Sequence, residues 1–190
     1  MLTVYIDFKS PNAYLALAPT LALAERYALD IDWRPFRTIE RDVPKLGEDE
    51  TVGESHRRVR ADSQRQLSIK YAAHQGIDLV FPKHPGDTDL ALAILTQVDG
   101  DPTAFIHGAF HAYWHAHADL NDMAVVHALL QESGVLYAGS LATAREDLEA
   151  AQDRAEAEGI VGAPAYVIAD QIFVGREHLP WIAELARDLD

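Results

Sequence analysis

Hydrophobic and polar residues alternate in patterns that predict strands at both ends of the chain and helices between them. The segment Leu2 to Phe8 is apolar on both faces, which is typical of a central strand covered on both sides. Residues Asn12 to Ala28 carry apolar side chains at helical spacing, and a second short strand is predicted from Ile31 to Phe36. The order strand, helix, strand predicts two parallel strands joined by a right-handed crossover.

A serine and a proline mark the start of the first predicted helix. Ser10 is of a type favoured at the N-cap, and Pro11 suits the first helical position, because its missing N–H needs no partner there. The free N–H groups of such a terminus carry partial positive charge, so they stabilise an anion such as a thiolate and lower the pKa of a thiol. Ser10 is therefore either a cap alone or a hydrogen-bond donor to a bound anion.

The middle of the chain is predicted to be helical. Residues 40–60 are polar and charged and are expected to form a loop that leads into a helix. Helical spacing follows over residues 55–75, 89–98, 102–118, 122–133 and 142–158. Asp101 and Asn121 are the expected N-caps of the third and fourth of these helices.

The end of the chain returns to β-strand character. Two short strands, 165–169 and 171–174, predict a hairpin around Asp170, and a last helix is expected over 177–189. The order βαβ, helical block, α, ββα is that of an α/β thioredoxin-like fold, a mixed sheet with an all-helical insertion. We expect residues 1–40 and 140–190 to form the thioredoxin-like domain, and residues 41–139 to form the inserted helical domain.

A proline precedes the first strand of this hairpin. The Ala163–Pro164 bond is a candidate cis peptide, which would leave the N–H and C=O groups of Ala163 free at the sheet edge to bind an extended peptide. The alternative is an ordinary trans proline at the start of a strand. These residues alone favour neither arrangement.

Composition narrows the classes of partner and of chemistry. The formal net charge of −14 repels phosphate backbones and anionic lipid, so we expect neither nucleic acid nor membrane as a partner. The chain has no cysteine, which excludes disulfides, thiolate–metal sites and dithiol redox chemistry by its own residues. It has no apolar stretch near the roughly 20 residues that span a bilayer, and its first residues do not resemble a signal peptide. A cytoplasmic protein is expected.

Three further features each allow two interpretations. Asp7, in an apolar strand, is either a buried acid with a raised pKa near the site or a residue that faces Arg34 or solvent. Three histidines at positions 107, 111 and 115 have a spacing that can serve a metal, but no recognised set of further ligands accompanies them, so no metal site is predicted. Tyr113 and Trp114 either pack in the helical block or line an aromatic substrate pocket.

Several segments, in order along nearly the whole chain, resemble the 2-hydroxychromene-2-carboxylate isomerases and kappa-class glutathione transferases of the DsbA-like superfamily. The first is VYIDFKSPNAYL at residues 4–15, in which a strand containing an acid leads into Ser-Pro and a helix. The others are WRPF at 33–36, Asp62 with Arg65, Phe81-Pro82 with Pro85, the aromatic residues at 110–114 with Asp119 and Asp122, GIVGAP at 159–164 and FVGRE at 173–177.

This resemblance implies that bound glutathione supplies the thiol that the chain lacks. It makes Ser10 the catalytic residue, which would donate to the glutathione sulfur and favour the thiolate. Ala163, before a cis Pro164, would pair its backbone with the cysteinyl unit. Arg176 and Glu177 would hold the γ-glutamyl carboxylate and ammonium, respectively.

The activity implied is that of a glutathione-dependent isomerase, in which a thiolate adds to a conjugated aromatic substrate and leaves again after a bond rotation. A kappa-like glutathione transferase, which releases the conjugate, is an alternative. A non-redox DsbA-like module that binds peptides without enzymatic activity is another. The resemblance also implies a homodimer.

Overall fold

The computed structural model describes residues 1–39, 43, 51–83, 85–137 and 139–189. The chain divides into two compact units, one of residues 1–38 with 81–190 and one of residues 39–80. Residues 40–42 and 44–50 of the predicted loop lie outside the described residues.

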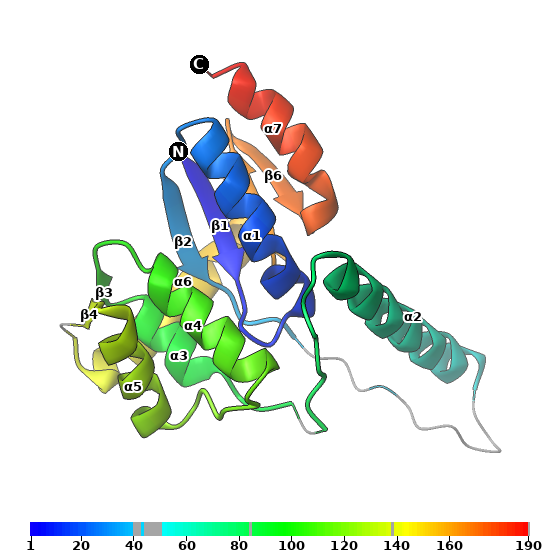
Figure 1. Ribbon diagram of the computed structural model, residues 1–190, viewed down its shortest axis with the longest axis horizontal. Helices are drawn as coiled ribbons and strands as arrows, with labels where there is room; N and C mark the ends of the chain where they lie inside the picture. The colour runs from blue at the N-terminus through cyan, green and yellow to red at the C-terminus, as the bar shows by residue number, and fades with distance from the viewer. Residues whose placement is uncertain (40–42, 44–50, 84, 138, 190) are drawn as a thin grey trace. The chain divides into compact units, whose positions relative to one another are not determined.

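The larger unit is built on a mixed sheet of the strands β1 (Leu2–Ile6), β2 (Ile31–Pro35), β5 (Ala165–Ile168) and β6 (Gln171–Val174). Their order is β2-β1-β5-β6 (Figure 1). β1 pairs parallel with β2 and antiparallel with β5, which in turn pairs antiparallel with β6. The predicted thioredoxin-like α/β fold, with its mixed sheet, is confirmed.

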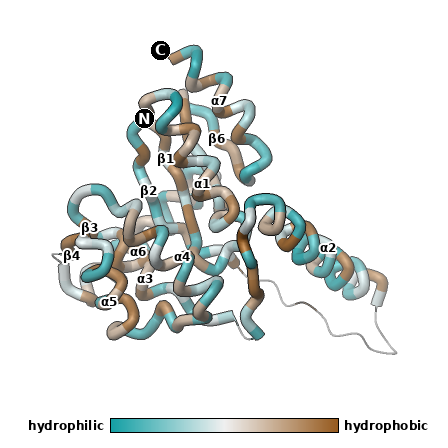
Figure 2. The backbone as a smooth tube through the Cα atoms, viewed as in Figure 1, coloured by the Kyte–Doolittle hydropathy of each residue, from teal (hydrophilic) through white to brown (hydrophobic). Residues whose placement is uncertain are grey.

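The centre of the sheet forms the core of this unit. Each of the five residues of β1 is buried, as expected for a strand covered on both faces, and hydrophobic residues run along it (Figure 2). The hairpin turn between β5 and β6 holds Ala169 and Asp170 at positive φ, which is the geometry of a tight two-residue hairpin.

Helices flank this sheet. α1 packs against α7 and the 3₁₀ turn η1, α3 packs against α6 and β2, and α4 packs against α5. The bounds are α1 (Pro11–Arg26), α3 (Asp89–Leu95), α4 (Thr103–Trp114), α5 (Met123–Ser133), α6 (Leu141–Glu158), η1 (Arg176–His178) and α7 (Leu179–Arg187). Helices α3 to α5 thus belong to the same compact unit as the sheet, and the proposed domain boundaries at 40 and 140 stay a prediction.

The smaller unit contains α2 (Val52–His74), which begins with a capping box. The Thr51 hydroxyl accepts from the Glu54 N–H at 3.3 Å, and the Glu54 carboxylate accepts from the Thr51 N–H at 2.9 Å. No helix among the described residues is long and apolar enough to cross a membrane.

The structure corrects some predicted boundaries. The N-cap of α5 is Asp122 rather than Asn121, because the Asp122 carboxylate accepts from the Ala124 N–H at 2.8 Å. α4 ends four residues early, and His117 beyond its end adopts positive φ, which a continuing helix does not allow. The pair β3 (Val98–Asp99) and β4 (Leu136–Tyr137) was not predicted, since two-residue strands carry no periodic pattern.

Candidate functional site at the start of helix α1

Ser10 lies at the N-cap of α1 and is only 8% exposed. Its hydroxyl oxygen accepts from the Ala13 N–H at 3.2 Å, and its hydroxyl hydrogen is donated to the Ala163 carbonyl at 2.8 Å. The first turn of α1 holds no acidic residue, so the partial positive charge of the terminus is not neutralised there. The predicted cap is confirmed, and the site keeps its capacity to stabilise an anion.

The Ala163–Pro164 segment meets Ser10 across 153 residues of sequence, as the predicted fold requires. The Ala163–Pro164 bond is cis. The Pro164 carbonyl accepts from the Gly175 N–H at 2.8 Å, whereas no partner is recorded among the described residues for the Ala163 N–H. One donor of the Ala163 backbone is therefore open to a ligand, and its acceptor is covered by the Ser10 hydroxyl.

Arg176 and Glu177 follow directly after Gly175 and form the start of η1. The hydrogen bond from Gly175 to Pro164 therefore brings both residues next to the Ala163–Pro164 segment. A side chain at Gly175 would be strained, because φ is 108°, and its Cβ would displace the Glu177 carboxylate.

The pKa of Tyr166 is affected by the charges of Arg176 and Glu177. Burial raises the pKa of its phenol to about 12, a hydrogen bond with Thr20 and the charge of Arg176 lower it, and the charge of Glu177 raises it. Both charges at the start of η1 thus act on a group two residues from the cis proline. The structure brings all five predicted residues to one end of the sheet and of α1.

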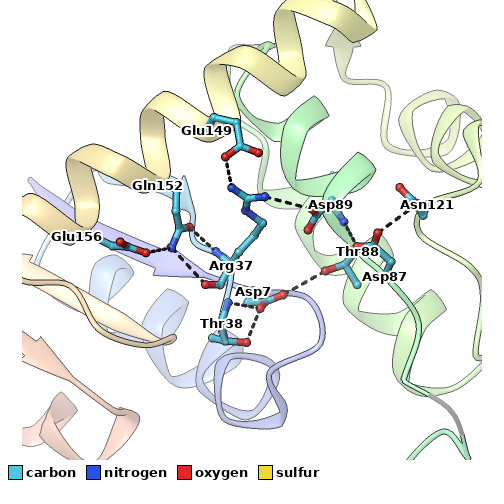
Figure 3. A network of polar contacts seen from close by, with 10 residues as sticks. All are labelled: Asp7, Arg37, Thr38, Asp87, Thr88, Asp89, Asn121, Glu149, Gln152 and Glu156. Atoms are coloured by element: carbon cyan, nitrogen blue, oxygen red, sulfur yellow. Dashed lines mark hydrogen bonds and ion pairs between the residues drawn. The ribbon is translucent and has the colours of Figure 1, made fainter. Parts of the chain in front are cut away.

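Asp7 is a fully buried carboxyl three residues before Ser10. One of its oxygens accepts from the Thr38 N–H at 2.8 Å and the Thr38 hydroxyl at 2.5 Å. The other accepts from the Thr88 hydroxyl at 3.2 Å (Figure 3) and from the Lys9 N–H at 3.2 Å. Of the two interpretations of Asp7, the buried acid is correct. Arg34 instead pairs with Asp32 at 2.8 Å.

A polar network continues from the hydrogen bonds between Asp7 and Thr38. Arg37, next to Thr38, pairs with Asp89 at 3.3 Å and Glu149 at 2.6 Å, and Gln152 accepts from its backbone N–H at 2.8 Å (Figure 3). The hydrogen bond to Glu149 raises the pKa of Arg37 and lowers that of Glu149. Sequence reasoning missed Thr38 and Thr88 as partners of Asp7, because nothing local marks a threonine that donates across the fold.

Asp7 makes the stability depend on pH. Burial raises the pKa of its carboxyl, and the hydrogen bonds from Thr38 and the charge of Lys9 oppose that shift only in part. As pH rises above the ordinary value of about 3.9, the unfolded chain loses a proton that the native state keeps, so the free energy of unfolding falls until the native pKa is passed. Below the ordinary value the group contributes no dependence.

Replacing Asp7 by asparagine is expected to flatten this fall in stability with rising pH. Urea unfolding at a series of pH values between about 4 and 8 measures it. Asp188→Asn, at a carboxylate that is 70% exposed, is the control and should leave the slope unchanged. Equal slopes in the wild type and Asp7→Asn would show that the native state binds no extra proton at Asp7.

Aromatic side chains of α4 close the core beneath the first turn of α1. Tyr113 and Trp114 are 3% and 2% exposed, so they pack in the core and do not line a substrate pocket. The Trp114 Nε1–H donates to the Phe8 carbonyl at 3.0 Å, and Tyr14 stacks on Trp114 with the ring planes 1° apart.

The histidines of α4 lie at its exposed side. The His111 and His115 rings stack at 4.6 Å, and His115 Nε2 shares a 2.8 Å hydrogen bond with the Tyr14 hydroxyl. Among the described residues, no group of three or more His, Asp or Glu side chains could hold a metal ion.

Comparison with known proteins adds to this geometry. The family model of DSBA-like thioredoxin domains matches residues 1–186. The chain belongs to this family. Over 193 residues it is 28% identical to a 2-hydroxychromene-2-carboxylate isomerase from Sphingobium xenophagum, and the match covers 97% of this chain and 96% of that protein.

Solved structures of other proteins share the fold. A 2-hydroxychromene-2-carboxylate isomerase superposes with a TM-score of 0.74 at 19% identity, covering 99% of this chain and 95% of the other. The cytosolic disulfide reductase DsbM from Pseudomonas aeruginosa, with GSH, superposes with a TM-score of 0.51 at 17% identity, covering 99% and 96%. Within the family, this chain has Ser10 at the start of α1 and no cysteine at all.

Proposed function

We propose that the protein is a glutathione-dependent isomerase that acts on a small conjugated aromatic substrate. The observation that carries the proposal is the contact of 2.8 Å between the Ser10 hydroxyl and the Ala163 carbonyl, at the positive end of α1. The similarity over nearly the full length to a 2-hydroxychromene-2-carboxylate isomerase supports an isomerase as the class of enzyme. A related fold that has been solved with GSH supports the choice of thiol.

The residues present fit an extended peptide that carries a thiol. The Ser10 hydroxyl can turn from the Ala163 carbonyl toward a sulfur atom, and the carbonyl is then released to accept an N–H from the cysteinyl unit. The Ala163 N–H can donate to the carbonyl of the same unit, as in strand addition. The Ser10 hydroxyl and the Ala163 carbonyl each exchange one partner for another, so that binding leaves neither group unpaired.

Arg176 and Glu177 provide opposite charges directly after Gly175, whose N–H donates to the Pro164 carbonyl. The γ-glutamyl group carries one carboxylate and one ammonium at the same carbon. The Arg176 guanidinium can donate to the carboxylate, and the Glu177 carboxylate can accept from the ammonium.

Bound glutathione would supply a thiolate that adds to a conjugated double bond, allows rotation about the resulting single bond and is released unchanged. Ser10 holds the negative charge on sulfur by donating its hydroxyl hydrogen. The first turn of α1 adds the positive end of the helix dipole, which favours the anion before addition and after release. No electrons are gained or lost overall, because the substrate and product are isomers and the thiolate leaves unchanged.

Titration calorimetry with glutathione tests the binding step. We expect the wild type to bind glutathione in the millimolar range or tighter. Arg176→Gln should bind it more weakly, because this variant lacks the guanidinium that pairs with the γ-glutamyl carboxylate. Arg187→Gln, at an exposed cation of α7, is the matched control. A folded protein that gives no heat with millimolar glutathione would contradict the proposal.

Mass spectrometry then separates the two glutathione chemistries. An isomerase returns an isomer of the substrate with the same mass and leaves glutathione unchanged. A transferase, the alternative on the same site, would release an adduct that contains glutathione.

A further inference from the structure

A cavity lies at the outer edge of the sheet, on the larger unit. It has a volume of about 690 Å³, and all five residues of β2 line it. One wall is the face of α6 that carries Asp147, Ala151 and Arg154, and the other is the stretch from Leu95 to Pro102. None of the residues at the Ser10 site lines it.

The backbone of β2 offers hydrogen-bonding groups to this cavity. The bonds from the Leu2 N–H to the Asp30 carbonyl and from the Phe36 N–H to the Ile6 carbonyl fix which residues of β2 face β1. In a parallel pair, residues whose backbone groups bond to the neighbouring strand alternate with residues whose backbone groups point away from it. Asp32 and Arg34 therefore bond to β1, and Trp33 directs its N–H and C=O outward. No partner is recorded for these two groups among the described residues.

Trp33 lines the cavity, so a ligand there can pair with its outward-facing backbone groups, for which the described residues supply no partner. Pro35, the next outward position, has no N–H and ends the row of donors. The edge can therefore accept a short extended segment and does not support a long added strand.

Two charged residues of α6, Asp147 and Arg154, line the cavity beside this edge. Arg154 has no hydrogen-bond or ion-pair partner among the described residues, and Asp147 shares its carboxylate with the Gln97 amide. The two residues are seven positions apart, which places them on one helix face about 10 Å from each other along the axis. Arg34 on the strand is already paired with Asp32, which leaves Arg154 as the cation available to a ligand.

We propose that this cavity binds a short peptide of about three residues with free termini. An extended tripeptide spans about 10 Å, which matches the separation of Asp147 and Arg154 along the helix. Its central peptide groups pair with the Trp33 N–H and C=O, its carboxylate with Arg154 and its ammonium with Asp147. The proposal is independent of glutathione chemistry at Ser10.

Titration of the ¹⁵N-labelled protein with trialanine tests this site by NMR. The Trp33 backbone amide is expected to shift and saturate, and trialanine amide, which lacks the carboxylate, should bind about tenfold more weakly. Arg154→Gln should weaken trialanine by a similar factor and remove the preference for the free carboxylate.

Arg145→Gln, at an exposed arginine of the same helix outside the cavity, is the matched control and should bind trialanine normally. Ala151→Leu, which fills the cavity, should abolish the Trp33 shift, and Ser10→Ala should leave it intact. An absent Trp33 shift at saturating millimolar trialanine, or equal affinities of the wild type and Arg154→Gln, would overturn the proposal.

Discussion

Replacing Ser10 by alanine is expected to lower kcat/KM for the isomerisation about 100-fold at neutral pH, a loss typical of removing one donor from a developing anion. The donor that disappears is the hydroxyl now bonded to the Ala163 carbonyl at 2.8 Å. Without it the pKa of the bound thiol rises and less thiolate is present. Activity should therefore recover in part as pH is raised, which a pH profile of kcat/KM measures.

Ser140→Ala is a matched control for the loss of a helix cap. Ser140 is the N-cap of α6, and its hydroxyl accepts from the Thr143 N–H at 3.1 Å, as Ser10 accepts from Ala13 at 3.2 Å. Both variants should lose about 1 kcal/mol of stability, but only the Ser10 variant should lose activity. Similar activities of the two variants would show that Ser10 is a cap alone.

The second large effect is expected at Trp114. Replacing it by alanine should lower the free energy of unfolding by about 4 kcal/mol, because it empties a cavity between buried aromatic rings. The side chain is 2% exposed and packs against Phe81, Tyr113 and Tyr14. Chemical denaturation, with the midpoint and slope measured separately, determines the loss.

Trp114→Phe separates packing from hydrogen bonding at this position, and Trp181→Ala is the control at an exposed tryptophan. Trp114→Phe keeps a ring but leaves the Phe8 carbonyl without its 3.0 Å donor, so about 1–3 kcal/mol should be lost. Trp181→Ala, at a tryptophan that is 57% exposed, should cost less than about 1 kcal/mol. A Trp114→Ala variant as stable as Trp181→Ala would contradict the assignment of Trp114 to the core.

The order of elements was predictable because each strand and helix of the sheet carries a local signal. β1 is rich in apolar residues, Ser10-Pro11 marks a helix start, and the hairpin of β5 and β6 turns at Asp170. The meeting of Ser10 with Ala163 followed from that order, since parallel and antiparallel neighbours of β1 place both at one sheet end.

Other features depend on contacts between distant residues, which no local pattern records. The burial of Asp7 was one of two interpretations, and only its donors Thr38 and Thr88, 31 and 81 residues away, decide between them. The choice of Asp122 over Asn121 as a cap depends on which side chain accepts the Ala124 N–H. The cavity beside β2 arises from the end of α3 and from α6, which are far from β2 in sequence.

The pKa of the glutathione thiol, measured by thiolate absorbance in the complex with wild-type protein, tests the central claim most directly. A thiolate held by the Ser10 hydroxyl at the first turn of α1 should titrate below the pH at which glutathione titrates in water. The same titration with Ser10→Ala should move the pKa back toward the free value. A bound thiol that titrates as in water in both proteins would contradict the role given to Ser10 and to the start of α1.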